Sequence, residues 1–139
     1  MPKVAILPEI LPADGDRFTI ADLAREFDVT PRTIRFYESE GLIAPHREGQ
    51  QRVYSRRDRA RLGWILRGKR VGFSLADIRE LMDMYETAGP APQRRALIEK
   101  CRIRIDTLER QRADIDDTIS EIQAFVDAVD TSSAMSAAN

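Results

Sequence analysis

Residues 30–42, with the sequence TPRTIRFYESEGL, bring together side chains that could contact DNA. Arg32 and Arg35 can each donate paired hydrogen bonds to a guanine edge or hold a phosphate group. Phe36 and Tyr37 add two aromatic rings, one of them with a hydroxyl that can donate to phosphate. An ordinary amphipathic surface helix with a few arginines would look the same over this stretch. The neighbouring segments must therefore decide between the two interpretations.

The same stretch has helix signals at both ends. Thr30 can cap the helix, and Pro31 follows at the first helical position, where its missing N–H costs nothing. Gly41 can take the left-handed conformation that ends a helix. The sequence therefore predicts a helix of about ten residues, with Ile34 facing inward.

Another short helix is predicted immediately before it. Thr19 and Asp22 have the spacing of a capping box, with Asp in place of the usual Glu. The apolar residues that follow recur at helical spacing and predict a buried stripe, made of Ile20, Leu23, Ala24 and Phe27. Because only Asp28 and Val29 precede Thr30, the two helices form a candidate helix-turn-helix whose second helix would enter the major groove.

After Gly41 the sequence predicts a β-hairpin. We expect Glu48 and Gly49 at its tip, since glycine there supplies a positive φ. Such a hairpin is only marginally stable alone, so it must lean on the helices. Arg47 and Arg52 would then project beside the recognition helix, as a wing does. His46 is expected to be an exposed loop residue rather than a ligand or catalyst.

Two further helices and a break follow the hairpin. Ser55 and Asp58 repeat the cap spacing and begin a helix that is expected to reach about Val71. Ser74 and Asp77 give the same cap again and begin the next helix. Residues 89–92 hold a glycine and two prolines, which end that helix.

A strict seven-residue repeat runs through residues 93–129 and predicts a coiled coil. We call its apolar positions and the one arginine among them the seam: Ile98, Cys101, Ile105, Leu108, Arg112, Ile115, Ile119, Ile122, Val126 and Val129. So narrow a stripe requires one partner helix, and the expected partner is the same helix of a second chain. Cys101 is expected to be a small buried hydrophobic residue there. A charge at Arg112 costs stability but can fix register, by pairing with Glu109 or Asp116 of the partner chain.

Charge is unevenly distributed along the 139 residues, whose net charge is −1. Residues 17–72 hold 13 Lys and Arg against 7 Asp and Glu, a net charge of +6. Residues 73–139 hold 8 against 13, a net charge of −5. A basic half attracts nucleic acid through its phosphates. A basic surface without a partner is the alternative explanation.

Composition limits the other classes of function. No apolar run approaches the roughly 18 residues of a membrane span, and no signal-peptide layout is present, so we expect a cytoplasmic protein without a membrane partner. A single cysteine and a single histidine argue against a disulfide or a thiolate metal site. Without a phosphate-binding glycine loop or a nucleophile elbow, we expect no enzyme, no catalytic residues, no metal and no cofactor.

Three segments resemble the MerR family of bacterial transcription regulators: TIADLAREFDVTPRTIRFYESEGLIAP, RVYSRRD and LRGKRVGFSLADIREL. The resemblance implies a mainly α fold, in which a winged helix-turn-helix DNA-binding domain precedes two helices and a long dimerisation helix that forms an antiparallel coiled coil. It also implies a homodimer that binds a pseudo-palindromic site in double-stranded promoter DNA. Such dimers bend and untwist the DNA within an over-long promoter spacer, and RNA polymerase is therefore an implied partner.

Carried over by position, the resemblance implies DNA contacts from Thr30, Arg32, Arg35, Phe36, Tyr37, Arg47, Arg52 and Tyr54. The wing departs from many members, which have Gly-Tyr where Gln50 and Gln51 stand here. Residues 124–139 hold none of the cysteines that metal and redox sensors of the family use there, so we expect neither metal nor iron-sulfur sensing. The segment REGQQRVYSRRDR most resembles the subgroup that controls leucine, isovalerate and related acyl-CoA catabolism genes.

These signals divide the chain into five expected regions. They are a flexible arm (1–16), the winged helix-turn-helix domain with two following helices (17–86), a linker (87–92), the dimerisation helix (93–129) and a disordered tail (130–139). The favoured hypothesis is a homodimeric, sequence-specific regulator. The alternative is a coiled-coil protein-interaction module whose basic domain has no specific operator. The sequence identifies no small-molecule effector; Met82, Met84, Tyr85 and Phe125 could line such a site or pack in the core.

Overall fold

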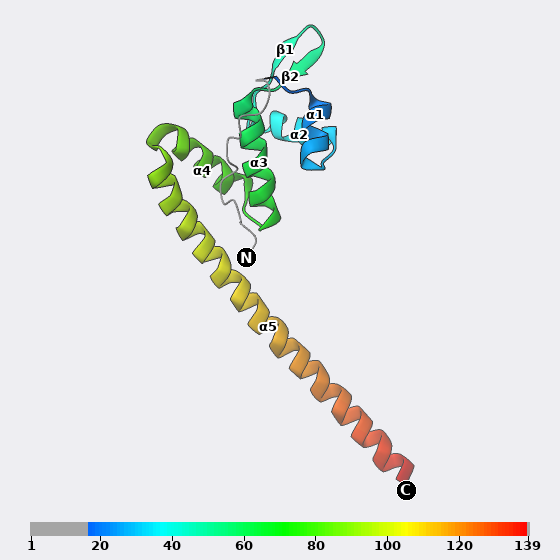
Figure 1. The fold of residues 1–139 in the computed structure, drawn as a ribbon. Helices are drawn as coiled ribbons and strands as arrows, with labels where there is room; N and C mark the ends of the chain where they lie inside the picture. Colours follow the sequence, from blue (N-terminus) through cyan, green and yellow to red (C-terminus); the bar gives the residue numbers. More distant parts are fainter. Residues whose placement is uncertain (1–16, 139) are drawn as a thin grey trace. The chain divides into compact units, whose positions relative to one another are not determined.

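The computed structural model describes residues 17–138, which form five helices and one two-stranded hairpin (Figure 1). The elements are α1 (Ile20–Phe27), α2 (Pro31–Ser39), β1 (His46–Glu48), β2 (Gln51–Val53), α3 (Arg56–Arg70), α4 (Leu75–Ala88) and α5 (Pro90–Ala138). This order confirms the predicted mainly helical fold, with a helix-turn-helix, a wing, two helices and a long last helix. The predicted arm, residues 1–16, lies outside the described residues.

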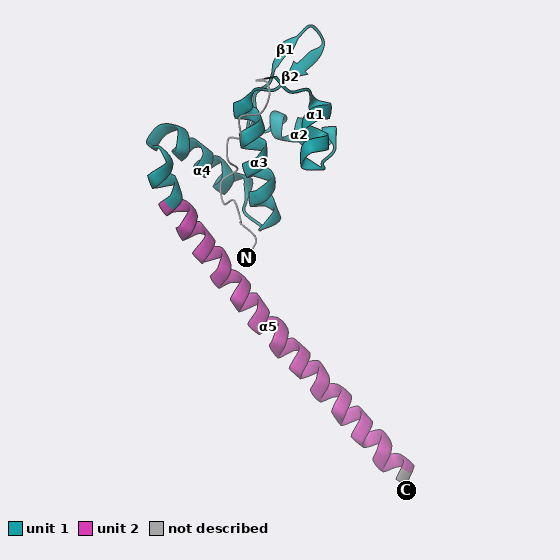
Figure 2. Cartoon of the chain, viewed as in Figure 1, with its two compact units in different colours: residues 1–94 teal, residues 95–139 magenta. Residues whose placement is uncertain are grey.

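The chain divides into two compact units, residues 1–94 and 95–139 (Figure 2). Within the first unit, the core draws side chains from α1–α4, from the turn after α2 and from the base of the hairpin. Its largest wholly buried aliphatic and aromatic side chains are Leu23, Ile34, Leu42, Tyr54, Leu62, Ile65 and Met82. In α1 only Leu23 of the predicted stripe is fully buried, while Ile20, Ala24 and Phe27 are partly buried.

Caps fix the two helices of the helix-turn-helix. Thr19 forms a complete capping box with Asp22, since the hydroxyl accepts from the Asp22 N–H and the carboxylate accepts from the Thr19 N–H. These bonds lower the pKa of Asp22. The Thr30 hydroxyl accepts from the Thr33 N–H, and Pro31 stands at the first position of α2. Gly41, with φ of +73°, then ends α2 as the sequence predicted.

The hairpin is antiparallel, and Arg47 pairs with Arg52 across it. Its two-residue tip is Gly49 and Gln50 rather than Glu48 and Gly49, since Glu48 still pairs with Gln51. Gly49 has φ of +62°, as the first central residue of a tight hairpin turn requires.

The base of the hairpin is continued by a bridge to the segment before α1. Phe18 and Tyr54 exchange two backbone hydrogen bonds of 2.9 Å, so the short hairpin is held by the start of the helix-turn-helix. An added backbone ladder of this kind supports a hairpin that would be marginal alone.

Helices α3 and α4 approach closely at Gly68. A Cβ added at this glycine would lie 2.8 Å from Ile78 Cγ1 and 2.9 Å from its Cδ1. Ile78 is buried, so only a residue without a side chain permits this approach.

Helix α5 is longer than the sequence predicted at both ends. It begins at Pro90, which leaves Gly89 as the residue between α4 and α5 in place of a linker over 87–92. Prolines are tolerated in a first helical turn because those N–H groups have no helical partner. The helix also continues to Ala138 through the segment expected to be disordered, since extending a formed helix through alanine-rich sequence costs little. Within the described part of the chain, no helix combines the length and the apolar character that a membrane crossing requires.

Candidate nucleic-acid interface

The outer face of α2 is cationic and aromatic. Arg32, Arg35, Phe36 and Ser39 are exposed and recur at spacings of three and four residues, so they share one face of the helix. The Phe36 side chain is 48% exposed. Within residues 17–138, Arg32 and Arg35 form no ion pair, so their guanidinium groups remain available as donors.

Tyr37 does not lie on this face. It follows the buried Ile34 by three residues, and its side chain is only 7% exposed. Burial raises the pKa of its phenol. The expectation that Tyr37 faces DNA is therefore corrected: its ring is part of the core side of α2, where it lies 5.4 Å from the ring of Phe36.

Thr30 acts as the cap of α2. Its hydroxyl accepts from the Thr33 N–H at 3.2 Å and lies 3.0 Å from the Thr33 hydroxyl. The residue is exposed at the N-terminal end of the helix, where helix dipoles favour a phosphate. The side chain therefore has a structural task as the cap of α2.

The two wing arginines differ in their surroundings. Because Arg47 and Arg52 are directly opposite in the hairpin, their side chains lie on the same face of it. Arg47 is exposed and forms no ion pair within residues 17–138. Arg52 is half-buried, and its Nε donates to Glu38 Oε2 of α2 at 2.8 Å. Glu48, which follows Arg47 in β1, pairs with Arg17, and this ion pair lowers the pKa of Glu48.

Tyr54 is completely buried, with 0% of its side chain exposed. Its hydroxyl has no hydrogen-bond partner among the described residues, and desolvation raises its pKa to about 12. The expected contact between Tyr54 and the DNA backbone is therefore not possible in this conformation. Its backbone is held by the bridge to Phe18, just before α1.

The turn after α2 is held by three side chains that the sequence did not single out for this role. Arg79 of α4 donates to the Glu40 carbonyl, and Arg61 of α3 donates to the Leu42 carbonyl at 2.7 Å. Asp58 accepts from the Ala44 N–H at 3.0 Å while also closing the cap at Ser55. The cap spacing predicted Asp58 as a helix start, but no local pattern shows that it reaches residue 44.

Arg61 also connects the turn to the far end of α4. Its Nη1 donates to Glu86 at 3.0 Å, and Arg57 donates to the same carboxylate at 2.7 and 2.8 Å. These bonds, first that from Arg57, lower the pKa of Glu86. The recognition helix is thus positioned at its C-terminal end by both α3 and α4.

In the second unit, the seam of α5 is uncovered in the single chain. The exposed fractions range from 43% at Leu108 to 67% at Val129, and Cys101 is partly buried. Exposed apolar residues include Ile98, Ile105, Leu108, Ile115, Ile119, Ile122, Val126 and Val129, and Arg112 is exposed among them. An apolar stripe of this length on a helix, interrupted only by Arg112 among the seam residues, indicates an interaction surface.

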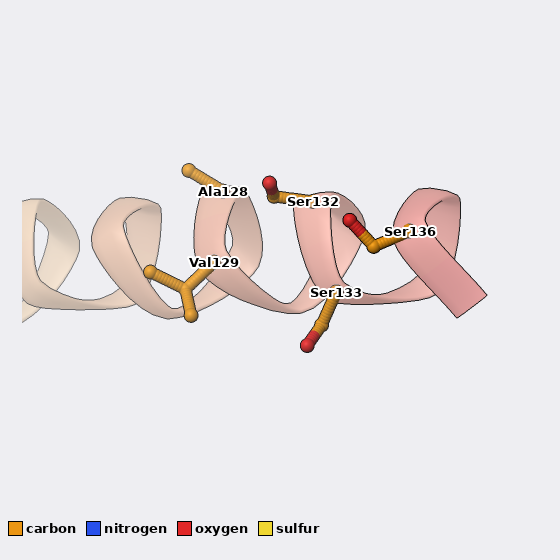
Figure 3. A pocket seen from close by; sticks show the side chains of 5 residues that line it. All are labelled: Ala128, Val129, Ser132, Ser133 and Ser136. Atoms are coloured by element: carbon orange, nitrogen blue, oxygen red, sulfur yellow. The ribbon is translucent and has the colours of Figure 1, made fainter. Parts of the chain in front are cut away.

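A depression near the end of α5 is lined by Ala128, Val129, Ser132, Ser133 and Ser136, which all come from one helix (Figure 3). No second element encloses it, and it contains no charged side chain. No group of three or more His, Cys, Asp or Glu among the described residues is placed to hold a metal ion.

A helix-turn-helix with a cationic outer face and a basic hairpin beside it is the arrangement of a winged DNA-binding protein. Comparison with known protein families agrees with this class of protein. The model of the MerR HTH family regulatory protein matches residues 18–85, and the model described as MerR, DNA binding matches residues 59–125.

Individual relatives extend this match. The HTH-type transcriptional regulator CueR of Salmonella typhi is 33% identical over 110 residues, which cover 78% of this chain and 73% of that protein. The HTH-type transcriptional regulator ZntR of Escherichia coli is 39% identical over 69 residues, covering 48% and 49% respectively. The chain belongs to the MerR family of DNA-binding transcriptional regulators. Membership in a family of regulators agrees with the expectation that the protein is not an enzyme.

Solved structures show the same fold. The N-terminal part of MtaN, the multidrug transporter activator of Bacillus subtilis, aligns with a TM-score of 0.62 at 26% identity, covering 78% of this chain and 97% of that one. A MerR family regulator from Bacillus cereus aligns with a TM-score of 0.61 at 22% identity, covering 77% and 78%.

Proposed function

We propose that the protein is a homodimer that binds a pseudo-palindromic site in promoter DNA and distorts it to control transcription. The outer face of α2 is the observation that carries this proposal. Two exposed arginines without ion-pair partners in residues 17–138 lie there beside an exposed phenylalanine, on a helix whose other side is fixed in the core. A rigid helix with free cations on one face suits the major groove.

Each side chain has a role that its chemistry allows. Arg32 and Arg35 would address guanine edges or phosphates, and Phe36 would contact an apolar base surface such as the thymine methyl group. Arg47 and Arg52 would contact phosphates from the wing, since phosphate contacts position a protein on the duplex. Thr30 would lie near the backbone at the start of α2.

The partner that we propose for the seam is the seam of a second copy. Helix α5 has 49 residues, about 74 Å at 1.5 Å per residue, and its apolar stripe repeats every seven residues. Two such helices would bury both stripes at once. Dimerisation would also place two recognition helices on two half-sites, as a pseudo-palindrome requires.

Charge along α5 favours an antiparallel arrangement. Residues 94–104 hold five Lys and Arg against one Asp or Glu, whereas residues 105–130 hold two against eight. Antiparallel helices bring the basic end of one against the acidic part of the other, while parallel helices would place like charges together. If the whole seam pairs, its second position, Cys101, faces its second-last position, Val126 of the partner subunit.

Oxidative cross-linking tests this arrangement. Antiparallel pairing along the whole seam predicts that Val126→Cys forms a disulfide-linked dimer between Cys101 and position 126, because disulfides need Cα atoms within about 4.4–6.8 Å. The unmodified chain should not cross-link, since its two thiols would be about 37 Å apart at 1.5 Å per residue. Cross-linking of the unmodified chain through Cys101 would instead support parallel helices, and a monomer in sedimentation would refute the dimer.

DNA binding is tested by selection from a random duplex library, followed by a salt series on the selected duplex. We expect affinity to fall steeply with salt. Arg35→Ala should lose sequence preference and about five- to 150-fold in affinity, which corresponds to about 1–3 kcal/mol for a base contact. Arg110→Ala on α5, which removes the same charge from an exposed residue outside the first unit, is the matched control. Equal losses for both variants, or no selected sequence, would favour the alternative of a protein-interaction module.

The regulated genes form the finer part of the proposal. We propose that RNA polymerase acts at the distorted promoter, in the cytoplasm where such DNA lies, and that the genes serve branched-chain amino acid or acyl-CoA catabolism. The support for these genes is the resemblance of residues 47–59 to that subgroup. Genomic footprinting of the purified dimer tests it, and footprints confined to unrelated promoters would refute the assignment.

A further inference from the structure

A carboxylate lies among the cations of the DNA-binding surface. Glu38 belongs to α2, and its Oε2 accepts from Arg52 Nε of β2 at 2.8 Å. The two side chains are 25% and 27% exposed, so water and salt screen this pair less than a pair on the open surface. The bond joins the recognition helix to the wing.

We propose that Glu38 is a positioning residue that orients the guanidinium group of Arg52 toward a DNA phosphate. The inference rests on the proposed function. Arg52 uses Nε toward Glu38, and its terminal nitrogens make no hydrogen bond within residues 17–138. An arginine fixed at one edge by a carboxylate holds its remaining donors in one direction, which lowers the entropy lost when they bind a phosphate.

The surroundings of the pair explain why Arg52 needs a partner. Arg47 lies directly opposite Arg52 in the hairpin, and like charges in that position repel. Tyr54 is buried near the pair: after the main effect of burial, Glu38 raises the pKa of its phenol and Arg52 lowers it. Both charges therefore act on a buried hydroxyl, and none of the described residues accepts a hydrogen bond from the terminal nitrogens of Arg52.

If Glu38 orients Arg52, removing its carboxylate should weaken binding to DNA. Simple electrostatics predicts the opposite effect. Loss of a negative charge beside DNA should strengthen binding to phosphates. Glu40 offers a matched control at the same end of α2. Its carboxylate is exposed and makes no hydrogen bond or ion pair within the described residues, although its carbonyl accepts from Arg79.

The test measures binding of a fluorescent mixed-sequence duplex by anisotropy over a salt series, with the full chain. Glu38→Ala should weaken binding by about five- to tenfold, whereas Glu40→Ala should leave it unchanged or tighter. Arg52→Ala should weaken binding and reduce the salt slope by about one. In the Arg52→Ala background Glu38→Ala should cause no further loss, while its effect should add to that of Arg47→Ala.

The combination with Arg47→Ala distinguishes two explanations. If Glu38→Ala displaced the whole wing, the phosphate contacts of Arg47 and Arg52 would be lost together and the two effects would not add. If it only releases Arg52, the two effects should add. Binding by Glu38→Ala as tight as or tighter than the unmodified chain would overturn the inference. If Glu38→Ala does not fold, Glu38→Gln retains an acceptor oxygen and should weaken binding less than Arg52→Ala; tighter binding would overturn the inference equally. An unmodified chain that shows no salt-dependent duplex binding would refute the proposed function instead.

Discussion

Gly68→Ala tests the close packing of α3 on α4. The added Cβ would lie 2.8 Å and 2.9 Å from two atoms of Ile78 and 3.7 Å from Phe73. The first two distances are well short of the roughly 3.5–4.0 Å at which carbon atoms pack. Overpacking of this kind costs about 1–3 kcal/mol, and alanine in place of glycine in a helix returns about 1 kcal/mol. The difference is a net loss of about 0–2 kcal/mol, and because Ile78 is buried and cannot move aside freely, we expect a value in the upper half of this range.

Urea denaturation at a fixed protein concentration measures this loss, since the proposed dimerisation would make stability depend on concentration. Ile78→Ala provides the companion variant, with an expected cost of about 2–5 kcal/mol for the cavity. The double variant should be more stable than the sum of the two losses predicts, because the new methyl group fills part of that cavity. Stabilisation by Gly68→Ala alone, or strict additivity, would show that the helices are not in close contact here.

Three further predictions concern charge. Tyr54→Phe should change stability little at neutral pH. The folded-state pKa of Tyr54 is raised from 10.0 to about 12, so the unmodified chain should lose up to about 2.7 kcal/mol of stability relative to the variant as pH rises through that range. Denaturation at several alkaline pH values checks this loss. Glu86→Gln should destabilise the protein at neutral pH. Because Arg57 lowers the pKa of Glu86 below its usual 4.5, the difference in stability from the unmodified chain should shrink as pH falls below that value. A pH-independent difference would contradict the ion pair between Arg57 and Glu86. Arg112→Leu should stabilise the dimer while admitting other registers or oligomers, and sedimentation showing unchanged geometry and stability would refute a role in register.

Local signals in the sequence predicted where α1, α2, α3 and α4 begin and where α2 ends, but they did not predict the bounds of α5. Thr19, Thr30, Ser55 and Ser74 each cap a helix in the structure, because a hydroxyl at that position satisfies an N–H that the helix itself leaves unpaired. Gly41 ends α2 with a positive φ for an equally local reason. These features depend on residues a few positions apart, and so they can be recognised without the fold.

The direction of the aromatic side chains was predicted less well. Tyr37 lies three residues after the inward Ile34, so the helical period contained a signal that it faces the core. Tyr54 had no such signal, because its burial depends on a bridge to Phe18, 36 positions earlier in the chain. The resemblance to a family named both residues by position, but exposure depends on the packing of this chain.

The sequence by itself determined the helix caps, the glycine that ends the recognition helix, the seven-residue repeat of the last helix and the basic character of residues 17–72. Only the tertiary structure decided which cations face outward. Arg52 pairs with Glu38 and Arg61 binds the Leu42 carbonyl across 14 and 19 residues, and Arg35 has no ion-pair partner in residues 17–138. The physical reason is that a cap needs its neighbours in sequence, whereas an ion pair needs a neighbour in space, and packing alone brings that neighbour near.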